Sequence, residues 1–299
     1  MRVKLTESQY KTLLEFQKRG YAFDWDDNVL VMPTHIHLEK KVGNEWIPVD
    51  VSTTEFAEIR HLLPNDKNPE GKGYRLLNNS ISDAYSDFRD YNTMIRDARE
   101  AIESGSFAPY FGKFKEALLY GNDFSIITAR GNPPKSIRET IKMIIDNHFT
   151  DEEREKMIDN LGGISKDKTL TQEEIEEIDK LNDKLIDEYL NLQNYDPISA
   201  DEYKERYGGG SSANPEREKM RALERFVKRV VSDAGNLKSN PKFTGFSVGF
   251  SDDDLGNVRA AEEFIRKDLI KKYPDVKFLV YDSSDPNNPK KNRIYLEKL

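Results

Sequence analysis

Two aspartates that follow a short apolar run could carry out chemistry on a phosphate. Tyr21–Phe23 predicts a buried strand, and Asp24 and Asp26 come directly after it. Side chains alternate along a strand, so both carboxylates project on the same side of its carboxyl end. Carboxylates placed there can hold Mg²⁺ while one attacks phosphorus and the other handles a proton. These residues alone are equally compatible with a strand that runs into an acidic turn.

A second apolar run ends in a hydroxyl group. Residues 123–128 predict a strand that closes on Thr128, and a glycine and two prolines then lead into a helix near residues 137–145. Backbone amides at the start of a helix suit phosphate, so Thr128 is a candidate phosphate ligand. The alternative is that Thr128 simply ends its strand. Arg130 is a second candidate for substrate contact, with a surface position as the alternative.

A third apolar run begins at Phe243 and ends in the paired acids Asp252 and Asp253. A helix follows this run. An earlier helix begins at Pro215 and carries Lys219 in its first turns. A lysine there opposes the helix dipole, so Lys219 is either a surface residue or the neighbour of an anionic group.

The elements that position these residues predict one α/β sheet. Parallel strands joined by right-handed crossovers bring their carboxyl ends to one rim. Residues 277–281 add a last parallel strand and residues 292–297 an antiparallel edge. Two further expectations are an amphipathic helix that starts near Thr6 and stops at Gly20, and a strand at residues 189–192.

A long segment separates the first strand from the second. It starts with a hairpin, residues 35–39 and 46–51 around a Gly43-Asn44 turn, which we expect directly beside the end of the Asp24 strand. Residues 52–120 are predicted to be mostly helical, with aromatic residues that are more often core than ligand platform. The predicted domains are a core of residues 1–30 and 121–299, with a helical elaboration at 131–213, and a flap hairpin and cap-like insertion at 31–120.

Composition narrows the class of protein. The 299 residues include no cysteine, 36% are apolar and 33% are charged, and no apolar run approaches the roughly 20 residues of a membrane span. We therefore expect a cytoplasmic protein without a membrane partner. The net charge of −8 is concentrated in residues 151–207, and no dedicated nucleic-acid-binding stripe is present. The four histidines show no convincing metal spacing; we interpret His35 and His37 as hairpin residues.

The strand-end residues resemble the motifs of the haloacid dehalogenase superfamily of phosphohydrolases. Asp24-Trp25-Asp26 is similar to its first motif, with Asn28 where many members have threonine or valine. The resemblance implies a three-layer, Rossmann-like core with an inserted cap after the first strand.

The other motifs of that superfamily have counterparts too. Thr128 resembles the second motif, a hydroxyl that closes a strand, and Asp252-Asp253 resembles the fourth, paired acids after a strand. The third motif is a lysine without strict spacing, and its candidates are Lys219, Lys238 and Lys242.

Family membership would give each residue a role. Asp24 would be the nucleophile that forms an aspartyl-phosphate, and Asp26 would protonate the leaving oxygen and then activate water. Mg²⁺ would be held by Asp24, by the backbone carbonyl of Asp26 and by Asp252, with Asp253 in support. The remaining candidates, Thr128, Lys219 and Arg130, would bind the phosphoryl group.

The resemblance therefore predicts a Mg²⁺-dependent phosphatase. Its phosphorylated substrate would be a nucleotide, a nucleic-acid end or a small metabolite. A non-catalytic binding or assembly protein is the alternative from another class, because fold does not fix function. A phosphotransferase would use the same residues. The sequence leaves the oligomeric state open.

Overall fold

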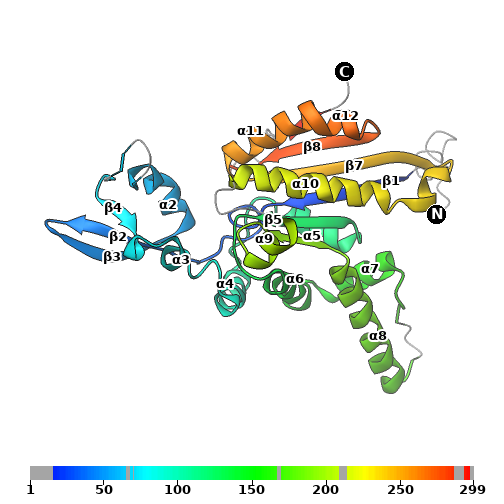
Figure 1. The fold of residues 1–299 in the computed structure, drawn as a ribbon. Coiled ribbons are helices and arrows are strands. Elements are labelled where there is room, and N and C mark those ends of the chain that lie inside the picture. The colour runs from blue at the N-terminus through cyan, green and yellow to red at the C-terminus, as the bar shows by residue number, and fades with distance from the viewer. Residues whose placement is uncertain are drawn as a thin grey trace.

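The computed structural model describes residues 16–64, 68–69, 71–166, 170–208, 214–285 and 293–296. Its centre is a six-stranded sheet in the order β6-β5-β1-β7-β8-β9 (Figure 1). The first five of these strands are parallel, and β9 is antiparallel to β8. The bounds are β1 Phe16–Phe23, β5 Asp123–Thr128, β6 Asn194–Pro197, β7 Phe243–Asp252, β8 Val276–Asp282 and β9 Arg293–Leu296. The predicted α/β class, last parallel strand and antiparallel edge are confirmed.

The strand β1 is longer at its amino end than the sequence predicts. Phe16 pairs with Phe243, and Gly20 with both Asp123 and Val248, so Phe16–Gly20 is strand and the helix predicted to end at Gly20 is wrong there. Residues 1–15 lie outside the described part of the chain. Gly20 marks a close approach instead of a helix stop, since a Cβ on it would lie 2.8 Å from Val230.

Helices cover both faces of the sheet. Side chains alternate, so Tyr21 and Phe23 pack into one apolar cluster while Ala22 packs into the other. The first cluster involves α4 Tyr91–Ser104, α5 Phe111–Leu119, α6 Pro134–His148, α7 Asp151–Leu161 and α8 Gln172–Asn191. The second involves α9 Asp201–Tyr207, α10 Pro215–Ser232 and α11 Leu255–Phe264, after which one π-helical stretch, Ile265–Leu269, leads to α12 Ile270–Lys272. The result is a three-layer arrangement (Figure 1).

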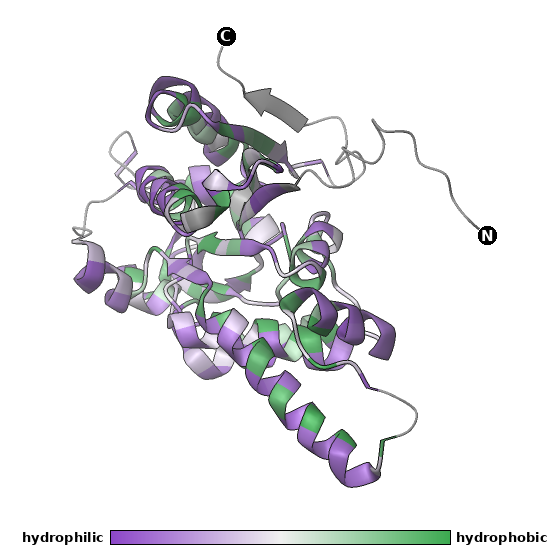
Figure 2. Ribbon diagram, turned by 90° about the vertical axis from the view of Figure 1, so that its right-hand side faces the viewer, coloured by the Kyte–Doolittle hydropathy of each residue, from purple (hydrophilic) through white to green (hydrophobic). Residues whose placement is uncertain are grey.

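The helix α8 replaces a predicted strand. Its capping box, Thr171 with Glu174, is formed as the sequence predicts, and so is that of α7. Tyr189 and Leu190 are buried on the face that also carries Ile186, so helical periodicity continues to the end of α8 and the strand predicted at 189–192 is wrong. The sheet strand β6 starts only at Asn194. The long helix at the bottom of Figure 2 shows this alternation of apolar and polar positions.

A second, three-stranded antiparallel sheet lies to one side of the core (Figure 1). Its strands β2 Ile36–Val42, β3 Glu45–Val51 and β4 Tyr74–Leu76 follow the order β3-β2-β4, with α2 Thr53–Ile59 between β3 and β4. We call residues 36–76 the small lobe. The hairpin is confirmed, with Gly43 at a positive φ of 63° in its turn. However, the hairpin points away from the central sheet instead of standing beside β1, and β4 was not expected.

The small lobe has an apolar cluster of its own. Ile36, Leu38, Val51 and Leu63 pack with Phe88, and the predicted core role of several aromatics of this segment is confirmed. The chain leaves β1 for the lobe through residues 31–35 and returns through α3 Ile81–Ala84 and residues 85–90. Short 3-10 helices occur at Arg60–Leu62, Leu77–Asn79 and Gly235–Ser239. Among the described residues, no helix has the length and apolar character needed to cross a membrane.

Candidate functional site

The carboxyl ends of β1, β5 and β7 meet where the strand order reverses. From β1 the chain continues to β5 and β6 on one side, and later to β7 and β8 on the other. A crevice forms outside the strand ends at such a switch point. A cavity of about 880 Å³ lies there, lined by Asp24, Asp26, Thr128, Lys219 and Asp253 from the core. Ile36, Thr53, Phe56 and Arg60 of the small lobe form part of its opposite wall.

Three of the predicted carboxylates converge in this cavity. Asp24, Asp252 and Asp253 each place a carboxylate oxygen within 4.8 Å of the others. Adjacent strands fix the first two, since the Asp24 N–H donates to the carbonyl of Ser251 at 2.9 Å. Asp24 is 7% exposed and Asp252 is fully buried. The sequence pattern of acids at strand ends is therefore also a cluster in space.

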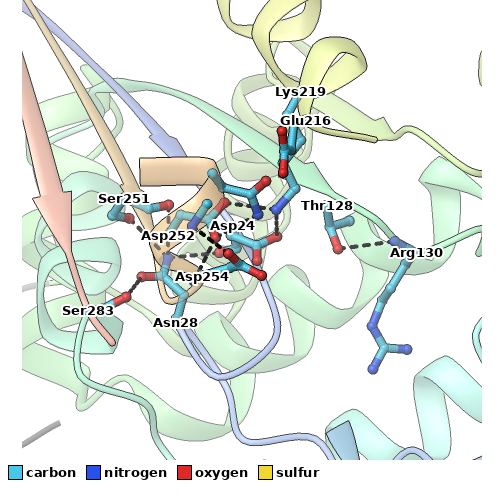
Figure 3. A network of polar contacts seen from close by, with 12 residues as sticks. Asp24, Asn28, Thr128, Arg130, Glu216, Lys219, Ser251, Asp252, Asp254 and Ser283 are labelled. Carbon is cyan, nitrogen blue, oxygen red and sulfur yellow. Dashed lines mark hydrogen bonds and ion pairs between the residues drawn. The ribbon is translucent and has the colours of Figure 1, made fainter. Parts of the chain in front are cut away.

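Lys219 joins this cluster from α10. Its Nζ lies 3.1 Å from Oδ1 of Asp24 and 2.8 Å from Oδ2 of Asp252, and the residue is 2% exposed (Figure 3). The alternative that Lys219 is a surface residue is wrong. Of the other two candidate lysines, Lys242 directly precedes β7 and so lies at the amino end of the strand, away from Asp252, and Lys238 stacks on Phe246 in the first part of β7. Only Lys219 of the three candidates reaches the acids.

The electrostatics of the cluster are unbalanced. Burial raises the pKa of Asp24 well above its usual range, against the opposing attraction of Lys219, and the neighbouring Asp252 and Asp253 raise it further. Burial, together with repulsion from Asp252 and Asp27, raises the pKa of Asp253 to about 7. Burial would lower the pKa of Lys219, but Asp24 and Asp252 outweigh it and the net shift is upward. Three carboxylates thus face one ammonium group.

Polar neighbours orient Asp252 and the backbone of Asp24. Asp252 Oδ1 accepts hydrogen bonds from the Asp254 N–H and from Asn257 Nδ2, both at 3.0 Å. Asn28 Nδ2 donates to the carbonyl of Asp24, and Asn28 Oδ1 accepts from the Ser283 hydroxyl. The sequence did not single out Ser283. Its position just after β8, at the same rim, is the signal that could have found it.

The carboxylate of Asp26 is directed toward Arg130 and not toward the other three carboxylates. Its carboxylate accepts two hydrogen bonds from Arg130, from Nε at 2.8 Å and from Nη2 at 2.6 Å. It therefore lines the cavity without joining the three-acid cluster. Arg130 is 1% exposed, so the surface alternative is wrong for it too. Its guanidinium contacts protein groups, and Figure 3 shows it directed away from Lys219.

Thr128 lies between Lys219 and Arg130 (Figure 3). It is buried, and its Oγ1 accepts the backbone N–H of Arg130 at 3.3 Å. The helix α6 follows without a side-chain cap on its first amides. His37 belongs to the hairpin, as predicted, and it contacts Asp50 in the small lobe and Asp87 in the returning connection.

Comparison with known proteins finds no matching family model, no matching curated protein and no matching solved structure. The functional conclusion therefore depends on the geometry of this site.

Proposed function

We propose that the protein is a Mg²⁺-dependent phosphomonoesterase of the haloacid dehalogenase type. The observation that carries the proposal is the contact of Lys219 with both Asp24 and Asp252 at a strand-end switch point. The buried ammonium group of Lys219 holds the Asp24 carboxylate in place as a nucleophile. The same ammonium group can stabilise negative charge during phosphoryl transfer. On this proposal the central sheet is the catalytic core and the small lobe is its cap.

The donor set suits a hard divalent cation. Oδ1 of Asp24 is buried and, apart from the ion pair with Lys219, accepts no hydrogen bond from the described residues. Asp24, Asp252 and Asp253 supply oxygen ligands only, which Mg²⁺ prefers, and their uncompensated negative charge calls for a cation. When bound, Mg²⁺ would neutralise the repulsion between the carboxylates and a phosphate dianion.

The chain's own residues account for the remaining steps. Asp24 attacks phosphorus and forms an aspartyl-phosphate, while Thr128 and Lys219 bind the phosphoryl oxygens. Asp26 gives its proton to the leaving oxygen and then removes one from the water that hydrolyses the intermediate. Asn28 and Ser283 hold the backbone around Asp24.

The substrate class follows from what surrounds the cavity. The small lobe covers one side, and a cavity of about 880 Å³ accommodates a nucleotide or a small metabolite phosphate. A nucleic-acid end would have to enter between the lobe and the core. We therefore favour a small phosphorylated molecule.

Phosphate release tests the proposal. Nucleotides, oligonucleotide ends, sugar phosphates and an aryl phosphate are incubated with the protein in Mg²⁺ or in EDTA. We expect release that requires Mg²⁺ and falls by roughly a thousandfold or more in Asp24→Asn. Asp233→Asn, which removes an exposed carboxylate at the end of α10, is the matched control and should keep wild-type activity.

Two other results would point away from hydrolysis. Binding of Mg²⁺ without turnover of any substrate would favour the non-catalytic alternative. Transfer of the phosphoryl group to an added alcohol in place of water would identify a phosphotransferase. Activity that persists in Asp24→Asn would contradict the assigned nucleophile.

A further inference from the structure

Arg89 lines the large cavity, and its guanidinium has no hydrogen bond or ion pair with any described residue. The other described cations that line this cavity are all paired. Lys219 contacts two carboxylates of the acid cluster, Arg60 lies 3.5 Å from Asp254, and Arg130 holds the carboxylate of Asp26. Arg89 is therefore a positive group in the cavity wall whose charge the described part of the chain does not compensate.

Arg130 cannot take the place of Arg89 as a ligand for an anion in this arrangement. Its guanidinium donates to Asp26, to the Thr34 hydroxyl at 2.8 Å and to Asn132 Oδ1 at 3.2 Å. Four of its five N–H groups thus have protein partners, and the residue is buried. A ligand would have to break these bonds to reach Arg130, whereas the guanidinium of Arg89 is available.

Gly131 allows the chain segment of Arg89 to pack closely beside the end of β5. A Cβ on Gly131 would lie 3.1 Å from Cγ of Arg89 and 3.3 Å from the carbonyl oxygen of Ser199. The Gly131 N–H also donates to the carbonyl of Phe88 at 2.9 Å. Because Gly131 follows Thr128 by three residues, these contacts place Arg89 and Ser199 near the residue that we propose binds the phosphoryl group.

Ser199 offers a second polar group at the same place. It is half-buried and lines the large cavity, and its hydroxyl has no hydrogen-bond partner among the described residues. Its backbone is fixed, since the Ser199 N–H donates to the carbonyl of Arg130 at 3.2 Å. A guanidinium and a hydroxyl are both donors that suit a carboxylate or a phosphate. The complementary ligand for the pair is an anion.

The charges around Arg89 indicate the side from which an anion would bind. A smaller cavity of about 190 Å³ is also lined by Arg89 and Ser199, together with Asp201 and Glu202. These two acids do not line the large cavity. Their negative charge disfavours an anion in the smaller cavity, so the anion is expected in the large one, which also contains Thr128.

We propose that Arg89 and Ser199 form a subsite for a second anionic group of the substrate. This rests on the proposed function, in which Thr128 and Lys219 bind the phosphoryl group that is hydrolysed. The substrate is then a small phosphomonoester that also carries a carboxylate or a second phosphate. Contacts to this second group, which does not react, contribute binding energy and hold the ester in a fixed position for attack by Asp24.

Three series of phosphate esters test the subsite. All have a straight alkyl chain, from ethyl to hexyl, because the distance between the two groups must match the site. The chain ends in a methyl group in the first series, in a carboxylate in the second and in a second phosphate in the third. Phosphate release gives kcat/KM for each ester, calculated per phosphate group in the third series. We expect the wild type to favour an anionic end by about tenfold or more at the best chain length, as charge-assisted hydrogen bonds commonly allow.

Variants assign this preference to the subsite. Arg89→Gln should lower the preference for an anionic end by about tenfold or more, and Arg89→Lys should retain part of it, because lysine keeps the charge but loses the planar fork. Ser199→Ala should lower the preference by a smaller factor. Arg99→Gln, which removes an exposed arginine on α4 outside the cavity, is the matched control and should keep the wild-type preference.

The two anionic series also identify the second group, since the larger kcat/KM shows whether the subsite takes a carboxylate or a phosphate. A wild type that does not distinguish anionic from methyl ends would overturn the inference alone. So would an Arg89→Gln protein with the wild-type preference, or with equal losses on all three series. Turnover of an aryl phosphate without turnover of any alkyl ester would have the same meaning. A folded wild type that releases phosphate from no ester at all would overturn the proposed function and the inference with it.

Discussion

Lys219 determines the charge balance of the site. It is the only buried ammonium among the described residues, and it lies between two carboxylates that have no other cationic partner there. A buried charge that loses its partner typically costs about 3–5 kcal/mol, because the remaining charge is neither solvated nor paired.

We therefore predict that Lys219→Met lowers the free energy of unfolding in EDTA by about 3–5 kcal/mol. On the proposed function Mg²⁺ should restore part of this loss, since it would bind the same carboxylates only in the folded protein. Urea unfolding with and without Mg²⁺ measures both effects. Lys228→Met, an exposed lysine on the same helix, is the control and should change little. A Lys219→Met protein as stable as wild type in EDTA would contradict this account of the charges.

The sequence predicts some residues of the site better than others. Asp24, Thr128 and Asp252 could be placed because the strand-end position of a residue follows from pattern and topology alone. The direction of the Asp26 side chain could not, because it depends on Arg130, which lies 104 residues away in the chain. Thr34 gave no signal, since an isolated hydroxyl in a loop has no periodicity, and the only signal for Ser283 was its position directly after the last parallel strand.

At the scale of elements, the position of Lys219 depends on how α10 packs on β1. The two elements meet at Gly20, where an added Cβ would lie 2.8 Å from Val230 and 3.0 Å from Phe226. The same helix carries Lys219 at its other end. A displacement of α10 from β1 would therefore also move the ammonium group.

We predict that Gly20→Ala destabilises the protein by about 1–3 kcal/mol, as overpacking of a core commonly does. It should also weaken binding of Mg²⁺ by displacing Lys219 and the acids around it. Gly112→Ala is the matched control: nothing lies within 4 Å of a Cβ there, the residue is in α5, and the change should stabilise by up to about 1 kcal/mol. Calorimetric Tm values and Mg²⁺ titrations compare the two. Equal Tm shifts would show that Gly20 is not a packing contact.

The local sequence pattern accounts for most of the elements that were predicted correctly. Elements without such a pattern were missed or predicted wrongly. Capping boxes and apolar periodicity gave α7, α8 and α10, and the turn at Gly43 gave the hairpin. The segment Phe16–Gly20 has no decisive local pattern, and it is a strand because β5 and β7 pair with it on either side. The short strand β4 likewise exists only through its pairing with β2.

At the scale of the whole molecule, polar contacts join the core and the small lobe. Thr53 of the lobe donates to Asp27 at 2.8 Å, and Arg60 lies 3.5 Å from Asp254. The apolar cluster of the lobe also includes Phe88 of the returning connection. His37 of the lobe contacts Asp50 within it and Asp87 in the returning connection.

These contacts make part of the stability depend on pH. Burial lowers the pKa of His37, but the hydrogen bonds that its ring donates to Asp50 and Asp87 outweigh this effect, and the net shift of the pKa is upward. A histidine with a raised pKa binds its proton more tightly in the folded protein, so its stabilising effect is full below about pH 6.5 and is lost as the pH rises above the folded-state value.

We accordingly expect His37→Gln to lower the free energy of unfolding at a pH of about 5.5 and to change it much less at about 8.5. Urea unfolding at the two pH values provides the measurement. The exposed His61→Gln is the control and should show no such difference. A loss in His37→Gln that is larger at the higher pH would reverse the sign and refute the assignment.

Because β1 lies between β5 and β7, one of its two neighbouring strands is synthesised long after the other. The hydrogen bond between Asn28 and Ser251 joins residues that are 223 positions apart. At about 5–20 residues per second, a ribosome needs on the order of ten seconds or more to supply the second partner after the first. Until then β1 lacks a neighbour on one side, and an unpaired strand edge invites association with other chains. A chain that stops before β7 retains Asp24 but lacks Asp252 and Asp253, so on the proposed function we expect premature termination to yield an inactive product.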